Sequence, residues 1–414
     1  MQTKKLSNIL LILSLVILIF GSGYKLGEYK ILNSSIKGNN VNFNNTSNTK
    51  NIDFKLFWDA WNQLDQKYVD KKKLDPQKMF YGAIKGMVAS VDDPYTFFMS
   101  PNENKQSKDD LGGKFEGIGA QLGMKDNQIV IIAPLKKSPA EAAGVKAGDQ
   151  IIKVDNIAIK GQTLPEVVSK IRGTKDTKVT LSLNRSGKDF DITITRDQIL
   201  ITSVELSYET KLNCGNQCTK VAYLKLNQFG DTTNDEWDKA IDEITTKWNN
   251  KDIKGMIVDV RDNPGGYLES AVYLASEFVP ENTVIVKQES TTTPSKTYVS
   301  LRTGKLVDIP LVFIINKGSA SASEILAGAM RDNKKATLVG EKSFGKGSVQ
   351  DALDLQGGAG LHVTVAKWIL PNGDWINGKG IEPEVKIENV VKEGNTLTRQ
   401  DDVQLEKAID QVLK

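Results

Sequence analysis

The chain has 414 residues, enough for two or three domains with sizeable apolar cores. Its 54 Lys and Arg residues exceed its 51 Asp and Glu residues by a formal net charge of +3, which argues against a nucleic-acid partner. The two cysteines and one histidine have no metal-ligand spacing, and no Walker motif or dinucleotide fingerprint occurs, so neither a cofactor nor a metal is expected.

Residues 1–30 predict a membrane anchor or signal segment. Within them, residues 6–24 are almost entirely apolar, and as a helix they would span roughly 28 Å, close to the hydrocarbon thickness of a bilayer. Lys4 and Lys5 favour an N-terminus on the inside. Because no A-x-A site follows, an uncleaved single-pass anchor in the cell membrane is favoured over a cleaved signal peptide. In both cases the body of the protein is extracytoplasmic.

The next two stretches predict a flexible linker and then a helical region. Residues 31–50 are rich in Asn, Ser and Thr and carry few large apolar groups, which is typical of a tether. Residues 51–110 contain two stripes of apolar residues at helical spacing, which we interpret as core faces. The stripes are Phe54, Phe57, Trp58, Trp61 and Leu64, then Phe80, Ile84, Met87 and Val88.

Residues 111–199 predict a small domain of strands with two helices. A Gly-rich loop with a strand (EGIGAQLG) is followed by IVIIAP, the short helix PAEAAG, DQIIKVDN, the amphipathic helix LPEVVSKIRG and a hairpin. This order resembles a PDZ domain of the bacterial, circularly permuted type. The resemblance implies binding of polypeptides that end in a free C-terminus.

The expected peptide site of this domain lies between its first loop and its second helix. Gly117 and Gly119 leave the N–H groups of the loop free to receive a terminal carboxylate, and the strand from Ile118 to Leu122 offers an edge to an extended peptide. The pocket for the last side chain is expected to be formed by Leu164, Val168 and Ile171. Arg172, which follows this helix, is either a sensor of domain movement or a solvated arginine.

The only cysteines, Cys214 and Cys218, flank a Gly-Asn turn. An exported location permits a disulfide between them. Such a short loop constrains the unfolded chain little, so the bond would stabilise the fold only modestly. A free, inert pair remains the alternative.

Residues 200–390 predict an α/β core, and residues 391–414 a C-terminal helix. VAYLKLNQF and GMIVDVRDN read as buried strands, and the second runs directly into the glycine turn DNPGG. In an α/β core whose strands end in Gly-rich turns, the functional site is expected at those turns. The last helix has an apolar side suited to dimerisation, made by Val403, Leu405, Ile409, Val412 and Leu413.

One serine and one lysine in this core are candidates for catalysis. Ser321 lies where the apolar strand 311–315 gives way to a helix, and helix N-termini stabilise oxyanions. Ser321 and Glu324 also form an ordinary capping box, and Ser319 is an alternative cap. Such a nucleophile needs a base.

The single histidine is a poor candidate for that base. His362 alternates with apolar residues on both sides, which puts it on the opposite face of a strand from the core. The remaining possibility is a Ser-Lys dyad. Lys346 stands between two glycines that allow a close approach, and Lys342 is a nearby competitor.

The segments KGSASASEILAGAM and GEKSFGKGSVQ, with DVRDNPGG upstream, are similar to those of the C-terminal processing peptidases, also called tail-specific proteases. The resemblance covers nearly everything after residue 51. It implies that Ser321 is the nucleophile, Lys346 the general base and Gln350 the residue that orients the lysine. The backbone N–H groups of Ala322 and Gly266 would form the oxyanion hole.

The expected protein is therefore a multi-domain α/β (α+β) chain with an N-terminal anchor and helices, and with a PDZ domain inserted before a serine peptidase core. The expected activity is endopeptidase cleavage of exported proteins near unstructured, apolar C-terminal tails, through an acyl-enzyme. A homodimer is a further possibility. The rival reading is a non-catalytic PDZ scaffold that binds the tails of envelope proteins.

Overall fold

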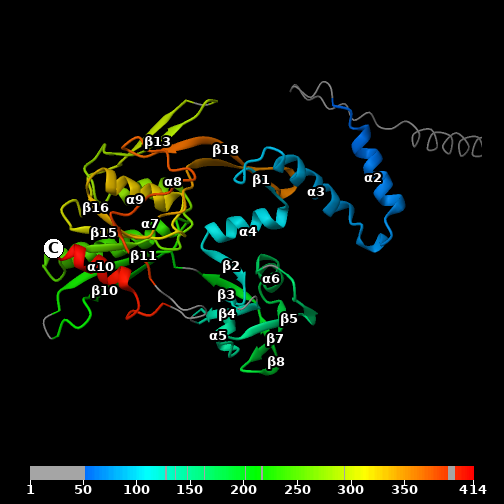
Figure 1. The fold of residues 1–414 in the computed structure, drawn as a ribbon, viewed down its shortest axis with the longest axis horizontal. Helices are drawn as coiled ribbons and strands as arrows, with labels where there is room; N and C mark the ends of the chain where they lie inside the picture. Colours follow the sequence, from blue (N-terminus) through cyan, green and yellow to red (C-terminus); the bar gives the residue numbers. More distant parts are fainter. Residues whose placement is uncertain are drawn as a thin grey trace, which may run out of the picture. The chain divides into compact units, whose positions relative to one another are not determined.

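The structure, a computed structural model, describes residues 52–125, 128–135, 137–146, 148–162, 164–200, 202–215, 218–292, 294–389 and 397–414. The chain divides into two units, Met1–Pro76 and Gln77–Lys414, each of which is described by itself (Figure 1). The expected anchor (1–30) and linker (31–50) lie outside the described residues. Within the described ranges, every helix is too short or too polar to span a bilayer.

The first unit contains helix α2, Lys55–Lys67, and the 3-10 helix η1, Lys71–Lys73. The aromatic stripe on α2 does form, with the ring centroids of Phe57 and Trp61 6.1 Å apart. No residue of α2 is buried, however, and Trp58 is 56% exposed. This finding corrects the expectation of a core face, because within the described residues no apolar surface covers the stripe.

The second unit begins with helix α3, Pro76–Ala89, and helix α4, Pro101–Leu111. The only buried residue of α3 is Val88, which packs with Phe98 and Ala359 in a small cluster. The other large residues of the expected stripe stay largely exposed, Phe80 at 51% and Met87 at 66%. Helix α4 begins at the N-cap Ser100 and has Pro101 in its first turn, a favourable start for a helix.

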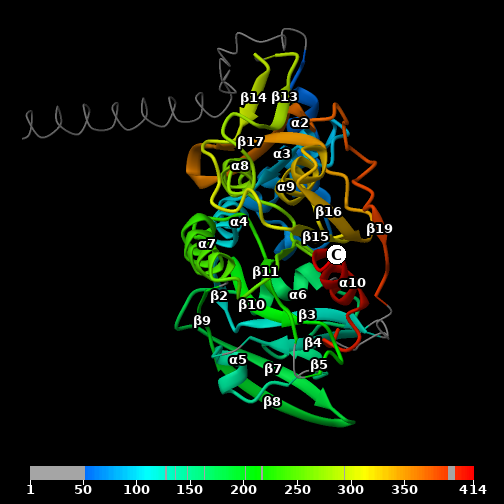
Figure 2. The same ribbon diagram turned by 90° about the vertical axis from the view of Figure 1, so that its left-hand side faces the viewer.

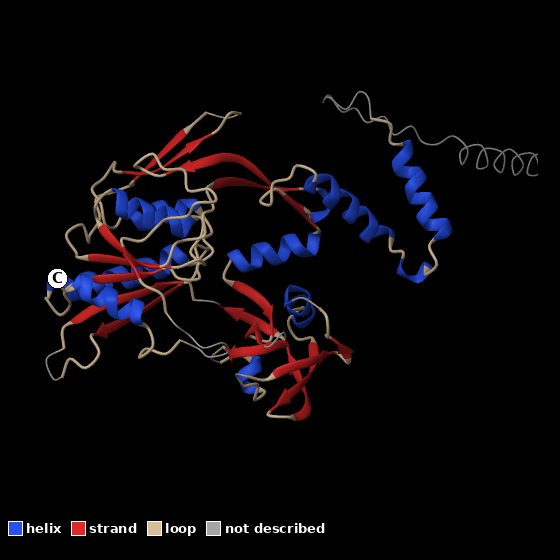
Figure 3. Cartoon of the chain, viewed as in Figure 1, coloured by secondary structure: helices blue, strands red, loops and turns tan. Residues whose placement is uncertain are grey.

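A module of strands with two helices follows, as the sequence predicts (Figure 3). Its sheet has the order β3-β4-β5-β7-β8, with β6 beside β5, and β3 lies at the edge. A separate ribbon of β2 and β9 flanks the module. The elements are β2 Lys114–Gly117, β3 Ala120–Lys125, β4 Gln128–Pro134, α5 Pro139–Ala142, β5 Gln150–Val154, β6 Ile157–Ala158, α6 Leu164–Ile171, β7 Lys178–Arg185, β8 Lys188–Thr195 and β9 Asp197–Leu200.

The core of the second unit is built on a six-stranded sheet of order β10-β11-β12-β15-β16-β19. β10 and β11 pair antiparallel, and the remaining neighbours pair parallel. The strands are β10 Val204–Thr210, β11 Lys220–Leu226, β12 Met256–Asp259, β15 Leu311–Ile315, β16 Ala336–Gly340 and β19 Val385–Lys386. The helices packed on this sheet are α7 Thr233–Asn249, α8 Leu268–Ala275, α9 Ala322–Asp332 and α10 Val403–Val412.

Both faces of this sheet are covered at its centre, which explains why β15 is apolar throughout. Phe313 of β15 joins the larger core cluster, together with residues of α7, α8 and α9. Val312 and Ile314 pack instead with Leu405 and Ile409 of α10. Figure 2 shows α10 beside β15. A strand buried on both sides shows no polar alternation, as is usual for parallel sheets.

The apolar side of α10, which the sequence suggested for dimerisation, is therefore used within the chain. Leu405, Ile409 and Val412 are buried against the central sheet. Only the ends of the expected stripe stay exposed, Val403 at 42% and Leu413 at 36%. That side of the helix is not available to a second copy of the chain.

A second, five-stranded sheet carries the lysine motif, and its existence was not predicted. Its order is β1-β18-β13-β14, with β17 also paired to β18. The strands are β1 Phe97–Met99, β13 Val284–Glu289, β14 Lys296–Val299, β17 Ser348–Asp354 and β18 Gly360–Ile369, and the short helix η2 Gln356–Gly358 joins the last two. β1 comes from the region expected to be helical, so this region also supplies one strand to the sheet beside the lysine.

Cys214 and Cys218 form a disulfide in the connection between β10 and β11. This result decides between the two alternatives that the sequence left open.

Candidate active site

Ser321 lies at the turn between a buried strand and a buried helix. β15 ends at Ile315 and α9 begins at Ala322, so Ser321 is the N-cap residue of the helix. Its backbone has φ 55° and ψ −117°, a conformation that L-residues rarely adopt and that clusters at functional sites. Ser321 is partly exposed, whereas residues 322–330 are buried. The turn thus presents this residue at the positive end of a helix.

The two serines on either side of Ser321 hold the turn in place. The Ser319 hydroxyl donates to the Val260 carbonyl at 2.7 Å, and the Ser323 hydroxyl donates to the Asn263 carbonyl at 3.0 Å. Both serines are fully buried. Ser319, the alternative cap, is therefore committed to a neighbouring carbonyl, and Ser321 is the accessible serine of the three.

The glycine turn 262–266, which follows β12, packs directly against Ser321. A Cβ atom on Gly265 would lie 2.8 Å from the Ser321 Cβ and 2.9 Å from the Ala322 nitrogen, and Gly265 has φ 100°. Only glycine fits this approach. Among the described residues, the N–H groups of Gly266 and Ala322 have no hydrogen-bond acceptor. Unpaired N–H groups beside a serine can receive an oxyanion.

The Glu324 carboxylate joins the serine segment to the lysine segment. Oε2 accepts hydrogen bonds from the backbone N–H groups of Ser321 at 3.0 Å and Lys346 at 2.9 Å. Oε1 accepts hydrogen bonds from the Gly345 N–H at 2.7 Å and from the Ser343 hydroxyl at 2.5 Å. Glu324 is 1% exposed, and burial raises its pKa while these four donors lower it, with a net rise. One buried side chain thus holds both motifs.

The Lys346 side chain is partly buried against an aromatic ring. Its Nζ lies 5.2 Å from the centroid of the Tyr95 ring. Burial lowers the pKa of Lys346, and the nearby carboxylates of Asp93 and Glu324 act in the opposite direction without cancelling this effect. Removal of a lysine from water favours its neutral form, which is the form that accepts a proton.

The expected partners of Lys346 are not hydrogen-bonded to it. Among the described residues, its Nζ makes no hydrogen bond to Ser321 or Gln350. The Gln350 amide instead donates to the hydroxyls of Ser348 at 2.8 Å and Thr364 at 3.2 Å. The competing lysine, Lys342, is exposed and pairs with a surface carboxylate.

The single histidine lies near the lysine. His362 stacks on Phe97, with ring centroids 4.7 Å apart, where β1 pairs with β18. Burial and the Lys346 charge both lower the pKa of His362. His362, like Lys346, makes no hydrogen bond to Ser321 within the described part of the chain.

The expected carboxylate loop of the PDZ module is tight and has free donors. Gly119 has φ 70°, and a Cβ atom there would lie 2.5 Å from the Ser138 Cβ. The carbonyls of Ile118 and Gly119 accept hydrogen bonds from Ala140 and Leu135. No described residue accepts from the N–H groups of Ile118 and Gly119. β3, which follows the loop, is an edge strand of its sheet, as expected.

The expected side-chain pocket on α6 differs in part from the structure. Val168 is partly exposed, but Ile171 is 3% exposed and belongs to the core of the module together with Val167. Ile171 therefore packs inward, and of the pocket residues Val168 is the one that the structure leaves accessible. The side chain of Leu164 lies outside the described parts.

Arg172 makes a specific contact, in contrast to a solvated arginine. Its guanidinium donates to both oxygens of Asp110 in α4, at 2.8 and 3.1 Å, and lies 4.9 Å above the centre of the Phe115 ring. α4 is in turn bonded to the end of β17, because Asn104 and Lys108 both contact Asp354. Contacts thus run from the end of α6 to the strand that follows the lysine motif.

Two features of this site were not predicted from the sequence. Glu324 was interpreted only as part of a capping box, and Tyr95 was given no role. A signal for Glu324 was present, since this carboxylate lies within a run of small and apolar residues that predicts burial, and a buried carboxylate needs partners. The position of Tyr95 depends on the pairing of β1 with β18, and no local pattern predicts that contact.

Comparison with known proteins gives three family matches. Residues 220–387 match the peptidase family S41, residues 130–185 match a PDZ domain, and residues 18–103 match the N-terminal domain of the activating protease CtpB. All three matches agree with the order of parts described above.

Individual relatives match over most of the chain. The carboxy-terminal processing protease CtpA of Bacillus subtilis is 39% identical over 357 residues, which are 86% of this chain and 72% of CtpA. CtpB of the same organism is 39% identical over 331 residues, 80% of this chain and 66% of CtpB. A solved structure of a photosystem II D1 C-terminal processing protease is 30% identical, with a TM-score of 0.53, over 80% of this chain and 92% of that one. The chain therefore belongs to peptidase family S41, the C-terminal processing proteases, which are serine-type hydrolases that here carry a PDZ domain.

Proposed function

We propose that this protein is a serine endopeptidase that cleaves exported proteins near unstructured, apolar C-terminal tails, with Ser321 as nucleophile and Lys346 as general base. The observation that carries the proposal is the shared Glu324 carboxylate, which binds the backbone N–H groups of both residues. The strained backbone of Ser321 and the lowered pKa of Lys346 support the same roles.

In the proposed reaction, neutral Lys346 takes the proton of the Ser321 hydroxyl while Oγ attacks the substrate carbonyl. The N–H groups of Ala322 and Gly266 stabilise the oxyanion, and the lysine returns the proton to the leaving amine. Water, activated by the same lysine, then hydrolyses the acyl-enzyme. Gln350 orients the lysine.

This reaction requires the Lys346 side chain to leave the Tyr95 ring, over which it now lies. Gln350 must also exchange at least one of its hydroxyl partners in order to meet the lysine.

The PDZ module is proposed to bind the substrate tail. A terminal carboxylate is received by the N–H groups of the loop Gly117, Ile118 and Gly119, and the chain before it adds to the edge strand β3. The last side chain is expected to lie against α6, near Leu164, Val168 and Ile171. Charge-assisted hydrogen bonds make a free C-terminus the preferred ligand.

Binding at the module is also proposed to gate the protease. The contacts of Arg172 with Asp110, and of α4 with Asp354, provide a physical connection between the module and the lysine strand. A tail that shifts α6 would change these contacts and, through β17, the position of Lys346. An uncleaved N-terminal anchor is also proposed, and it would hold the PDZ module and the peptidase core on the outer side of the membrane. A homodimer is proposed as well.

Labelling of the serine with a fluorophosphonate tests the proposed function. We expect covalent modification of Ser321 in the unmodified protein, none in Ser321→Ala, and a large loss in Lys346→Ala. Circular dichroism of both variants should show an intact fold. If the protein binds tail peptides but neither reacts with the probe nor cleaves a substrate, it is a non-catalytic PDZ scaffold.

A further inference from the structure

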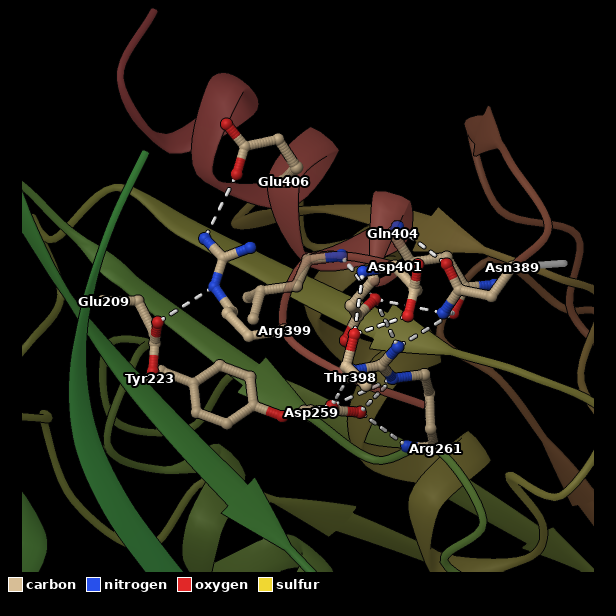
Figure 4. Close-up of polar contacts among 12 residues, drawn as sticks. Glu209, Tyr223, Asp259, Arg261, Asn389, Thr398, Arg399, Asp401, Gln404 and Glu406 are labelled. Atoms are coloured by element: carbon tan, nitrogen blue, oxygen red, sulfur yellow. Dashed lines mark hydrogen bonds and ion pairs between the residues drawn. The ribbon is translucent and has the colours of Figure 1, made fainter. Parts of the chain in front are cut away.

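A buried arginine stands at the start of the glycine turn, on the side of the sheet that carries α10. Arg261 follows the end of β12 and is 9% exposed (Figure 4). Its Nε donates to both oxygens of Asp259, at 3.0 and 2.9 Å, and Nη2 donates to Asp259 Oδ2 at 2.5 Å. Tyr223 donates to the same carboxylate at 2.5 Å. Tyr223 and Asp259 thus lie on two neighbouring strands, β11 and β12.

The remaining partners of the guanidinium come from the segment 397–414. Nη1 and Nη2 donate to the two oxygens of Asp402, at 2.9 and 2.8 Å. Nη1 also donates to Gln404 Oε1 at 3.0 Å (Figure 4). Asp402 and Gln404 are themselves buried. Asp402 is also the N-cap of α10, because it accepts the Leu405 N–H at 3.0 Å. A two-carboxylate cage thus fixes Arg261, and α10 supplies one half of it.

The backbone of Arg261 continues into the turn that faces Ser321. Its N–H donates to Asp259 Oδ1 at 2.9 Å. Two residues later, Asn263 accepts the Gly265 N–H with its side chain and the Ala320 N–H with its carbonyl. The guanidinium is therefore fixed at one end of the turn, and the groups beside the expected nucleophile are fixed at the other.

A second ion-pair cluster fastens the same segment but does not reach the turn. Arg399 contacts Glu209 of β10 and Glu406 of α10, each at 3.1 Å (Figure 4). Neither carboxylate is bonded to residues 259–266. A substitution in the Arg399 cluster therefore reports on the general docking of the segment 397–414, whereas a substitution in the Arg261 cluster also reports on the turn 262–266.

Stability alone is a weak reason for the Arg261 cage. Buried ion pairs are costly to desolvate, and apolar replacements often stabilise a fold as well or better. Their best-supported use is to fix one geometry. Arg261 lies where such a geometry would matter for the reaction, because the oxyanion-binding N–H of Gly266 belongs to the turn that it starts.

We propose that Asp402 is a positioning residue of the hydrolytic reaction, which acts through Arg261 to hold the turn 262–266 against Ser321. The segment 397–414 thereby takes part in building the oxyanion hole without contact with the substrate. This inference rests on the proposed function. Misplacement of catalytic groups by about 1 Å through a distant change can lower the rate about 100-fold.

The test compares Asp402→Ser with Glu406→Gln in the full chain. Serine is a good N-cap, so Asp402→Ser keeps the start of α10 while it removes the contact to Arg261. Glu406→Gln is the control, because it weakens the ion pair with Arg399 in the second cluster. We expect Asp402→Ser to lower kcat on a peptide reporter, and the rate of fluorophosphonate labelling of Ser321, about 10–100-fold, with KM and tail-peptide affinity unchanged. Glu406→Gln should leave all four values near those of the unmodified protein.

Three results would overturn the proposal: full kcat in Asp402→Ser, equal losses of kcat in both variants, or a rise in KM without a change in labelling rate. If Asp402→Ser does not fold, Asp402→Thr replaces it, since threonine also caps a helix and lacks the carboxylate that binds Arg261, and the same results are decisive. Failure of the proposed function is seen separately, because then even the unmodified protein would neither cleave the reporter nor be labelled at Ser321.

Discussion

The Lys346 N–H donates to Glu324 Oε2 at 2.9 Å. This bond joins the lysine motif, which leads into β17, to helix α9, which begins after Ser321. Glu324 lies in the first turn of α9, so its position is fixed by the helix itself. The relative placement of the two motifs therefore depends in large part on this buried carboxylate, beside one backbone hydrogen bond from the Phe344 N–H to the Ser319 carbonyl at 3.0 Å.

Replacement of this carboxylate should weaken the connection between the two motifs. In Glu324→Gln, the amide group would face hydrogen-bond donors on one side, and a buried donor without a partner costs about 1–3 kcal/mol. We expect a fall of about that size in the free energy of unfolding, and a loss of at least about tenfold in kcat/KM. Chemical denaturation and cleavage of a peptide reporter measure the two effects.

Glu103→Gln is the matched control for this variant. Glu103 also lies in the first turn of a helix and accepts the N–H of the N-cap residue Ser100, at 2.8 Å, but it has no contact with the lysine motif. A comparable loss of kcat/KM in both variants would mean that Glu324 acts only as a helix cap.

The pH dependence of the reaction should follow the lysine. Burial lowers the pKa of Lys346, so the neutral base becomes populated at a lower pH than for an exposed lysine. Below this pKa the lysine is protonated, and kcat/KM should fall about tenfold per pH unit. Lys346→Arg should be inactive, because a guanidinium stays protonated.

The same shift affects stability. The folded state binds a proton at Lys346 less readily than the unfolded state does, so the free energy of unfolding should rise with pH between the lowered pKa and the usual lysine range. Lys346→Met should remove this rise. His362→Gln should keep both the activity and its rise with pH through the lysine titration, and a folded but inactive His362→Gln protein would reassign the base.

The Arg172–Asp110 pair should couple tail binding to cleavage. We expect a tail peptide to change the rate at which a short, tail-less reporter is cleaved, and Asp110→Asn to reduce this change by weakening the bond to Arg172. Tail-peptide affinity, measured by fluorescence anisotropy, should stay within about twofold, because Asp110 lies outside the proposed binding groove.

Asp197→Asn is the control for this experiment. It removes an exposed ion pair with Lys175 on the strand that closes the module, with no contact to α4. If the tail peptide changes reporter cleavage equally in Asp110→Asn and in the unmodified protein, the contact does not transmit the signal.

Tail specificity should require a free, apolar C-terminus. Burial of a terminal Val or Leu side chain against α6 is worth about 1.5–3 kcal/mol. An unfolded reporter that ends in such a residue should therefore be cleaved with a higher kcat/KM than the same reporter ending in Asp-Asp or in an amide.

Gly119→Ala tests the carboxylate loop in the same assay. Its Cβ would collide with Ser138 at 2.5 Å, and alanine is strained at φ 70°, so cleavage of the tail-bearing reporter should fall while a tail-less peptide changes less. Equal kcat/KM for the three reporters would show that the loop does not read the carboxylate.

Local patterns were sufficient to predict much of the fold. The run 311–315 was read as a buried strand and is β15, and the order of elements in residues 111–199 predicted the PDZ module. Ser321 was singled out by the strand–turn–helix pattern around it. These features depend on neighbours in sequence.

The features that sequence could not predict depend on distant partners. β1 has three residues, and it is a strand only because Phe97 to Met99 pair with β18. The cage of Arg261 needs Asp402, which is 141 residues away. For the stripe on α2, the helical period correctly predicted a helix, but the expected burial of its apolar side is not found among the described residues.

The ribbon of β2 and β9 has a consequence for how this enzyme could be re-engineered. Gly117 pairs with Asp197, so the chain enters and leaves the PDZ module at neighbouring positions. A domain whose two ends meet can be exchanged as a cassette, because the host needs only the same short gap to be closed. Another peptide-binding domain with adjacent termini, joined at these two strands, would redirect the protease to a different class of tail while Ser321, Glu324 and Lys346 stay untouched.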